Sequence, residues 1–273
     1  MSSEIRTLRP PQGGSFEIEY ARARTPSGKP TIVLVPGIGG PRGTFHHQVR
    51  VFSEDRDVVD TNLNPVHASA MEPIDSAARD VLHLLDALAL PQVDLFAASY
   101  GTCVIARVAQ LAPARVRRLV WAAPPVIHHA PWRASFGPGW LFGGAAMKFA
   151  PLKYRGDVVR TLVERRIYSP EPDLSEEELL LLAGRASDTE FAPFFLRLGS
   201  LRDWDWRRLP RPFAHPVLAV QGEVEHALTP ADVKAALVAL SGRPIAVPPG
   251  KHMPYLSWPD PFNDVVRAFL DSP

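Results

Sequence analysis

The segment around Ser99 combines a hydroxyl group with the small neighbours that a sharp chain reversal requires. An apolar run at residues 93–97 leads directly into a helix-like stretch at residues 102–111. Ala97 and Gly101 stand two residues to either side of Ser99. Bulky side chains would clash there in a tight strand-to-helix turn, whereas small ones allow the turn to form. The following helix would also supply N–H groups where negative charge develops, so the pattern indicates a nucleophilic serine.

A histidine and two glutamates further along the chain could complete this chemistry. His252 follows a short apolar run at residues 244–247, and an imidazole can take and return a proton near neutral pH. Glu223 and Glu225 follow another apolar run at residues 217–220, and a carboxylate there could orient the imidazole. Each signal alone is common, since a loop histidine or glutamate is usually just solvated. The residues indicate catalysis only in combination.

The elements that must position these residues alternate between strand-like and helix-like segments. Short apolar or β-branched runs occur at residues 16–20, 31–35, 57–59, 93–97, 116–122, 217–220 and 244–247. Residues 74–90 keep apolar side chains at helical spacing, with charged residues between them. Runs as apolar as residues 31–35 are typical of parallel strands covered on both faces. We therefore predict an α/β fold with a doubly wound, mostly parallel sheet.

The alternation stops between residues 124 and 216, where aromatic and helix-like segments occur without a convincing strand. We predict a core formed by residues 1–124 and 213–273, with a mainly helical cap inserted at residues 125–212. Aromatic residues of this cap could form its own core or face the nucleophile. For an apolar substrate pocket we select Trp140, Phe142, Phe194 and Phe195.

Taken together, these segments resemble the α/β-hydrolase family. The small-x-Ser-x-Gly turn, a carboxylate three residues after a glycine and a Gly-x-His loop occur here in the family's order of Ser, Asp or Glu, and His. The resemblance implies that Ser99 is the nucleophile, that His252 is the base and that Glu225 orients the histidine. Glu223, or an acid from elsewhere in the chain, remains an alternative to Glu225.

A glycine-rich turn after residues 31–35 extends the resemblance. In the family this turn contributes one N–H group to the oxyanion hole, which implies that Ile38 donates one hydrogen bond here and Tyr100 the other. Pro36 stands where the family usually has histidine, but a backbone donor does not depend on that side chain. The usual Gly-x-Gly-x-Ser turn is missing at residues 61–65. A glycine turn that serves only chain reversal is the alternative.

Composition excludes several other classes of protein. Thirty basic and 29 acidic residues give a formal net charge of +1, so nucleic acid is not an expected partner. Cys103 is the only cysteine, which excludes an internal disulfide, and we expect it to be a buried small side chain rather than a catalytic thiol. We find no run that resembles a membrane span or a signal peptide core. We expect a cytoplasmic protein with neither a metal nor another cofactor.

The resemblance implies a hydrolase that cleaves a carboxylic ester or thioester with a hydrophobic acyl or aromatic group, through an acyl-enzyme at Ser99. The expected partner is therefore a small hydrophobic ester. The same residues could instead serve acyl transfer, hydrolysis of a carbon–carbon bond or lyase chemistry, because a fold and a triad do not separate these reactions. A ligand-binding member without turnover is a further alternative. The sequence predicts no oligomeric state.

Overall fold

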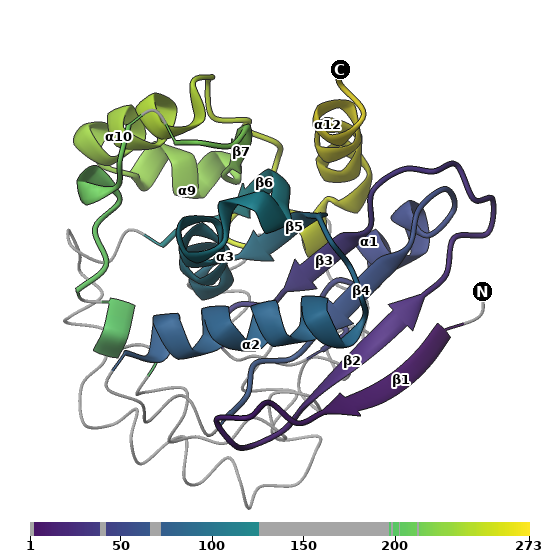
Figure 1. The fold of residues 1–273 in the computed structure, drawn as a ribbon. Helices are drawn as coiled ribbons and strands as arrows, with labels where there is room; N and C mark the ends of the chain where they lie inside the picture. Colours follow the sequence, from purple (N-terminus) through teal and green to yellow (C-terminus); the bar gives the residue numbers. More distant parts are fainter. Residues whose placement is uncertain are drawn as a thin grey trace, which may run out of the picture.

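A seven-stranded sheet forms the centre of the described part of the protein (Figure 1). The computed structural model describes residues 3–38, 42–65, 72–125, 197, 199–201, 203–211 and 213–273, except for the side chain of Leu228. The strands are β1 (Ser3–Leu8), β2 (Phe16–Ala21), β3 (Ile32–Val35), β4 (Val58–Thr61), β5 (Val93–Ala98), β6 (Val116–Ala122) and β7 (Val217–Val220). Their order in the sheet is β1-β2-β4-β3-β5-β6-β7. The pairs β1–β2 and β2–β4 are antiparallel, and all the others are parallel, which confirms the predicted fold class.

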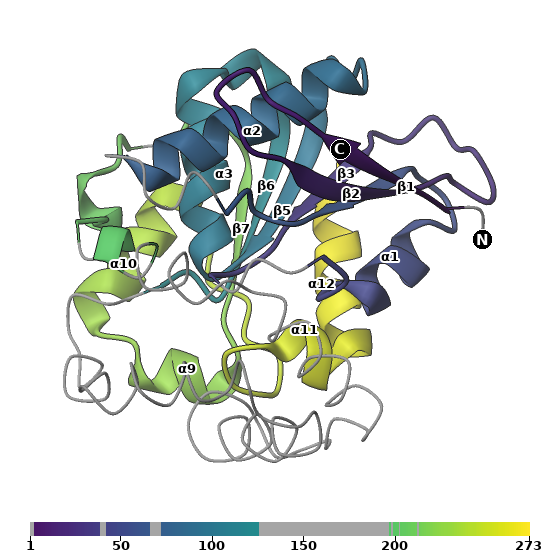
Figure 2. The same cartoon turned by 90° about the horizontal axis from the view of Figure 1, so that it is seen from below.

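Helices cover both faces of this sheet. They are α1 (His46–Phe52), α2 (Pro73–Ala87), α3 (Tyr100–Leu111), α9 (Glu223–Leu228), α10 (Ala231–Ser241), α11 (Pro254–Ser257) and α12 (Pro259–Leu270), with short 3₁₀ turns η2 (Pro113–Arg115) and η5 (Trp206–Arg208). Figure 2 shows α2 and α3 on one face and α1 and α12 on the other. Within the described ranges, no helix has both the length and the apolar character needed to cross a membrane.

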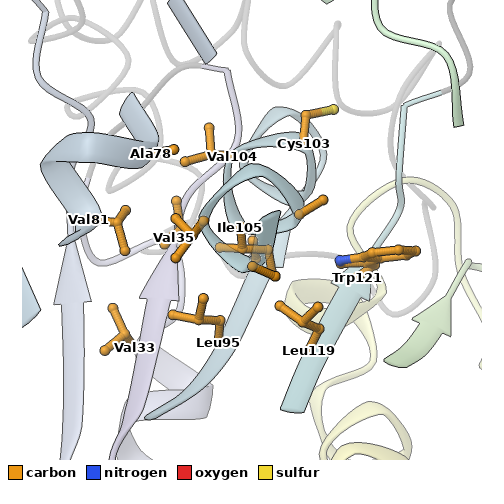
Figure 3. Packing of buried hydrophobic residues seen from close by; sticks show 14 of the residues in the cluster. Val33, Val35, Ala78, Val81, Leu95, Cys103, Val104, Ile105, Leu119 and Trp121 are labelled. Carbon is orange, nitrogen blue, oxygen red and sulfur yellow. The ribbon is translucent and has the colours of Figure 1, made fainter. Parts of the chain in front are cut away.

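The face under α2 and α3 forms the larger of two hydrophobic clusters. Ala78 and Val81 of α2 lie on the sheet side of the helix and are buried, whereas Arg79 and Asp86 are exposed. Figure 3 shows these apolar side chains above Val33 of β3, beside others from β5, β6 and α3. The amphipathic spacing of the sequence therefore places α2 on the sheet as predicted.

The opposite face is organised around an aromatic side chain of β5. Phe96 is fully buried, and its ring centroid lies 4.9 Å from that of Phe45 and 5.7 Å from that of Phe262 in α12. Its neighbour Leu95 is equally buried in the cluster on the other face. Successive side chains of β5 thus point into two different cores, which explains why the strand is apolar from Leu95 to Ala98.

Two strand predictions differ from the structure. The edge strand β1 was not expected, because Glu4 and Arg6 are exposed and the strand is held by its backbone pairing with β2. The predicted strand at residues 244–247 is wrong in extent, since only an isolated bridge joins Ala246 to Val220. Prolines at 244, 248 and 249 have no N–H group to donate to a ladder, which limits the pairing to one bridge.

The described residues of the predicted cap pack against the core. Leu201 and Trp206 are buried in the larger cluster, and the ring of Trp206 lies 4.8 Å from that of Trp121 in β6. The indole N–H of Trp206 donates to the carbonyl oxygen of Pro125 at 2.9 Å, which joins the two ends of the segment predicted as a cap. The selected pocket residues Trp140, Phe142, Phe194 and Phe195 lie outside the described residues. The boundaries of a cap stay a prediction.

We expect the substitution Phe96→Ala to lower the free energy of unfolding by about 3–5 kcal/mol, because it removes a fully buried ring and leaves a cavity between two other rings. Urea unfolding followed by circular dichroism measures this loss. The control is Val238→Ala on α10, where the side chain is 40% exposed and the change should be within about 0.5 kcal/mol. Equal losses in the two variants would contradict this account of the core.

Candidate active site

Ser99 occupies a strained backbone conformation between β5 and α3. Its φ is 49° and its ψ is −122°, a region that costs a non-glycine residue about 1–3 kcal/mol. Hydrogen bonds fix this conformation from both sides. The Ser99 N–H donates to the Ala122 carbonyl at 2.8 Å, while the N–H and the hydroxyl of Thr102 donate to the Ser99 carbonyl at 2.9 and 2.5 Å. The surrounding structure therefore imposes the turn on which a nucleophile could stand.

The small residues around Ser99 are required by close backbone packing. A Cβ atom at Gly101 would lie 2.6 Å from the carbonyl oxygen of Val35, and it would also overlap the carbonyl oxygen of Pro36. The same atom would be 3.2 Å from the Cβ atom of Ala97. Both small positions of the sequence pattern thus allow α3 to begin against the end of β3.

Glu225 and His252 are hydrogen-bonded to each other. The Nδ1 atom of His252 lies 2.8 Å from Oε1 of Glu225, and the two side chains are only 19% and 15% exposed. Glu223, the alternative acid, is exposed on the same short helix, α9. The structure therefore brings Glu225, and not Glu223, to the histidine.

The carboxylate changes the proton affinity of the imidazole. Burial lowers the pKa of His252, but the charge of Glu225 and its hydrogen bond together raise that pKa above the ordinary histidine value. The other carboxylate oxygen of Glu225, Oε2, is buried without a hydrogen-bond partner among the described residues, so within that part of the chain His252 is the main partner of the carboxylate. Because the pKa is raised, the pair stabilises the fold fully below the unfolded-state pKa, and this contribution is lost as the pH rises through the His252 pKa of the folded protein.

The acid and histidine segments pack directly on one another. A Cβ atom at Gly222 would be 2.7 Å from the carbonyl oxygen of Gly250 and would overlap the carbonyl oxygen of Lys251. The N–H group of Val224 donates to the same Gly250 carbonyl at 3.1 Å. This close approach fixes Glu225 relative to His252, and it explains why a glycine precedes the acid.

The two predicted oxyanion-hole donors belong to segments that contact Ser99. A Cβ atom at Gly37 would lie 3.5 Å from that of Ser99, so the turn carrying Ile38 runs beside the serine. Tyr100 is the first residue of α3, and its N–H group therefore has no acceptor within the helix. This arrangement is compatible with the donor roles that the sequence implies, which belong to the proposal below.

Ser99 and Glu225 follow two parallel strands of the sheet, β5 and β7. Ser99 follows β5, α9 follows β7, and β6 lies between the two strands, so both groups lie at the same edge of the sheet (Figure 2). The Ser99 hydroxyl makes no hydrogen bond to His252 in the structure. Catalytic hydrogen bonds are often long or poorly aligned in enzymes without substrate. The serine–histidine contact is therefore part of the proposal rather than an observed bond.

The structure adds one residue that the sequence did not reveal. Arg197 lies in the segment predicted as a cap and is only 3% exposed. Its guanidinium donates to the carbonyl oxygens of Ile38, Leu63 and Asn64 at 3.2, 3.3 and 3.1 Å. No motif marks an arginine that binds backbone carbonyls, so the sequence carried no signal for it.

Neither a catalytic thiol nor a metal site is found among the described residues. Cys103 is buried and unpaired, and burial raises the pKa of its thiol well above the ordinary value, which confirms the expected buried side chain. The acidic, histidine and cysteine residues of the described ranges form no group of three or more that could hold a metal ion.

We expect Glu225→Gln to lower the pKa of His252 below the ordinary histidine value, because burial then acts without the opposing carboxylate charge. Titration of the imidazole C–H signals by NMR measures the shift. If His252 acts as a base, the acid limb of kcat/KM should move to lower pH in parallel, with kcat about 10⁴-fold lower. The matched control Glu223→Gln, on the same helix, should leave the pKa unchanged. A shift in the control alone would assign the acid to Glu223.

Comparison with known proteins gives the family. A family model for the alpha/beta hydrolase fold matches residues 30–259. Similar solved structures include a hydrolase from Pseudomonas aeruginosa (21% identity, TM-score 0.73, covering 98% of each chain) and an enol-lactonase from Burkholderia xenovorans (18%, 0.76, covering 98% of this chain and 100% of that one). An epoxide hydrolase from Vigna radiata is similar at 18% identity and a TM-score of 0.73, over 98% of this chain and 97% of that one. The chain belongs to the α/β hydrolase fold family.

Proposed function

We propose that the protein is a serine hydrolase that cleaves a carboxylic ester or thioester through an acyl-enzyme at Ser99. The observation that carries the proposal is the strained turn at Ser99, at the sheet edge where His252 is held by Glu225. Membership of the family supports hydrolysis in general. The serine nucleophile and the ester bond rest on the residues themselves.

In this mechanism His252 removes the proton of the Ser99 hydroxyl as the oxygen attacks the carbonyl carbon of the ester. The bond between Nδ1 and Glu225 keeps the proton of the neutral imidazole on Nδ1, so that Nε2 is free to accept the serine proton. The resulting imidazolium is stabilised by the carboxylate, which raises the His252 pKa. His252 then protonates the leaving alcohol or thiol, and a water molecule hydrolyses the acyl-enzyme by the reverse sequence.

Negative charge on the carbonyl oxygen would be stabilised by the N–H groups of Ile38 and Tyr100. One comes from the turn beside Ser99 and the other from the unsatisfied first turn of α3. Such a donor typically contributes about 10²–10³ in rate, because it is already oriented when the charge develops. We therefore assign to these two donors a role in the chemical step rather than in substrate binding.

The aromatic residues of the inserted segment support a hydrophobic acyl or aromatic group on the substrate, among them Trp140, Phe142, Phe194 and Phe195. A near-neutral net charge of +1 adds no preference for a strongly charged substrate. The structurally similar enol-lactonase is named for a lactone, which is a cyclic ester. We therefore include lactones in the proposed substrate class.

We expect Ser99→Ala to lower kcat by at least about 10³-fold for every accepted ester, because the variant lacks the attacking oxygen. The measurement is a panel of p-nitrophenyl esters with increasing acyl length, lactones and an epoxide, together with active-site labelling by a fluorophosphonate. Ser241→Ala, which removes an exposed hydroxyl bonded only to its own turn, is the matched control and should keep full activity and labelling.

Several outcomes would contradict the proposal. Retained ester hydrolysis in Ser99→Ala would remove the serine from the mechanism. Turnover of the epoxide alone, or acyl transfer to an added alcohol in place of hydrolysis, would assign a different reaction to the same site. A folded protein that neither turns over any ester nor reacts with the fluorophosphonate would indicate a member that binds ligands without catalysis.

A further inference from the structure

Arg197 is a buried cation that binds the turn beside the nucleophile. We infer that Arg197 is a positioning residue of the oxyanion hole, which holds the Ile38 peptide in place and puts a positive charge behind the site where negative charge develops. The inference rests on the proposed function. It is carried by the three carbonyl contacts of the guanidinium, one of which is to Ile38 itself.

The partners of Arg197 are unusual for an arginine. In the described part of the chain its guanidinium contacts only backbone carbonyls, those of Ile38, Leu63 and Asn64, and pairs with no carboxylate. Burying a cation is costly, and among the described residues it is carbonyl oxygens, not a carboxylate, that offset this cost. The contacts join the turn after β3 to the loop after β4. Arg197 therefore crosslinks two loops at the edge where Ser99 stands.

The second donor residue lies within electrostatic reach of Arg197. The Tyr100 side chain is fully buried. Burial raises the pKa of Tyr100, while the charge of Arg197 and the neighbouring Ser200 oppose that increase. The Ser200 hydroxyl in turn donates to the Arg197 carbonyl at 2.7 Å. One cation thus contacts the Ile38 carbonyl and acts electrostatically on the residue that supplies the other donor.

This geometry has a mechanistic consequence. The guanidinium fixes the Ile38 carbonyl, which limits rotation of the backbone that also carries the Ile38 N–H. A donor that is held in advance stabilises an oxyanion without reorganisation, whereas a mobile donor loses this advantage. The positive charge lies in a poorly solvated environment, so it adds to the stabilisation of an anion more than it would in water. Both effects act on the transition state and little on the bound ester.

The test uses the full chain and the substitutions Arg197→Gln and Arg197→Lys. We expect Arg197→Gln to lower kcat about 10- to 100-fold, with KM changed less than about threefold, because the donors are displaced but the substrate pocket is not. Affinity for a boronic acid that mimics the tetrahedral intermediate should fall by the same factor as kcat/KM. Arg197→Lys keeps the charge, but a lysine cannot reach all three carbonyl oxygens. Its kcat should therefore lie between those of the wild-type protein and Arg197→Gln.

Rates are expressed per active site titrated with a fluorophosphonate, so that unfolded protein does not contribute. The control is Arg207→Gln, which removes an arginine paired with Asp205 and Asp232 on the surface and should change neither rate nor affinity. An unchanged kcat in folded Arg197→Gln would overturn the inference. So would a rise in KM at constant kcat, because that result would place Arg197 in substrate binding.

A readout without substrate separates this inference from the proposed function. The order parameter of the Ile38 amide, measured by ¹⁵N relaxation NMR, should fall from about 0.85 towards about 0.6 in Arg197→Gln and stay unchanged in Arg207→Gln, because the crosslink between the loops is lost. If the wild-type protein hydrolyses no ester, the proposed function fails, but a lower order parameter in Arg197→Gln would still show that Arg197 holds the turn. An unchanged order parameter would overturn the positioning role even if esterase activity is present.

Discussion

The left-handed backbone of Ser99 is the constraint on which the rest of the site depends. Such a conformation persists only where the surrounding structure fixes it. Here the Ala122 carbonyl accepts the Ser99 N–H, Thr102 binds the Ser99 carbonyl twice, and Gly101 lets α3 begin against the end of β3. The hydroxyl is therefore placed by the backbone, so its position does not depend on a flexible side chain or on a bound ligand.

Charged groups that stabilise the fold gather at the opposite edge of the sheet. Asp94, at the start of β5, is fully buried and accepts two hydrogen bonds from Arg117, one of them at 2.7 Å, although burial keeps the pKa of Asp94 raised. Beside it the buried Arg56 pairs with Asp271 after α12. The strained Ser99 and the Glu225–His252 pair thus follow the carboxyl ends of the strands, whereas the paired charges of Asp94 and Arg56 lie at the amino ends. The ion pairs at the amino ends stabilise the fold, and this stability offsets the strained backbone of Ser99 at the other edge of the sheet.

The features that the sequence predicted are those set by local patterns. Apolar runs and helical spacing predicted the parallel strands and α2, while the family resemblance favoured Glu225 and left Glu223 open until the structure showed the contact with His252. The strand β1 was missed because its backbone pairing leaves no apolar pattern. Arg197 was missed for a related reason: its partners are carbonyl oxygens, which every residue carries, so only the tertiary structure shows that they converge.

The glutamate that contacts His252 stands on a helix fixed by several hydrogen bonds. A glutamate has one methylene group more than an aspartate, so its backbone lies further from the imidazole, and here that backbone is the short helix α9. Thr229 fixes the helix by donating both its N–H and its hydroxyl to the Glu225 carbonyl, each at 2.9 Å. The buried Gln221 donates to that hydroxyl at 3.1 Å and so connects α9 to the end of β7. These hydrogen bonds hold the backbone from which the longer side chain reaches Nδ1 of His252.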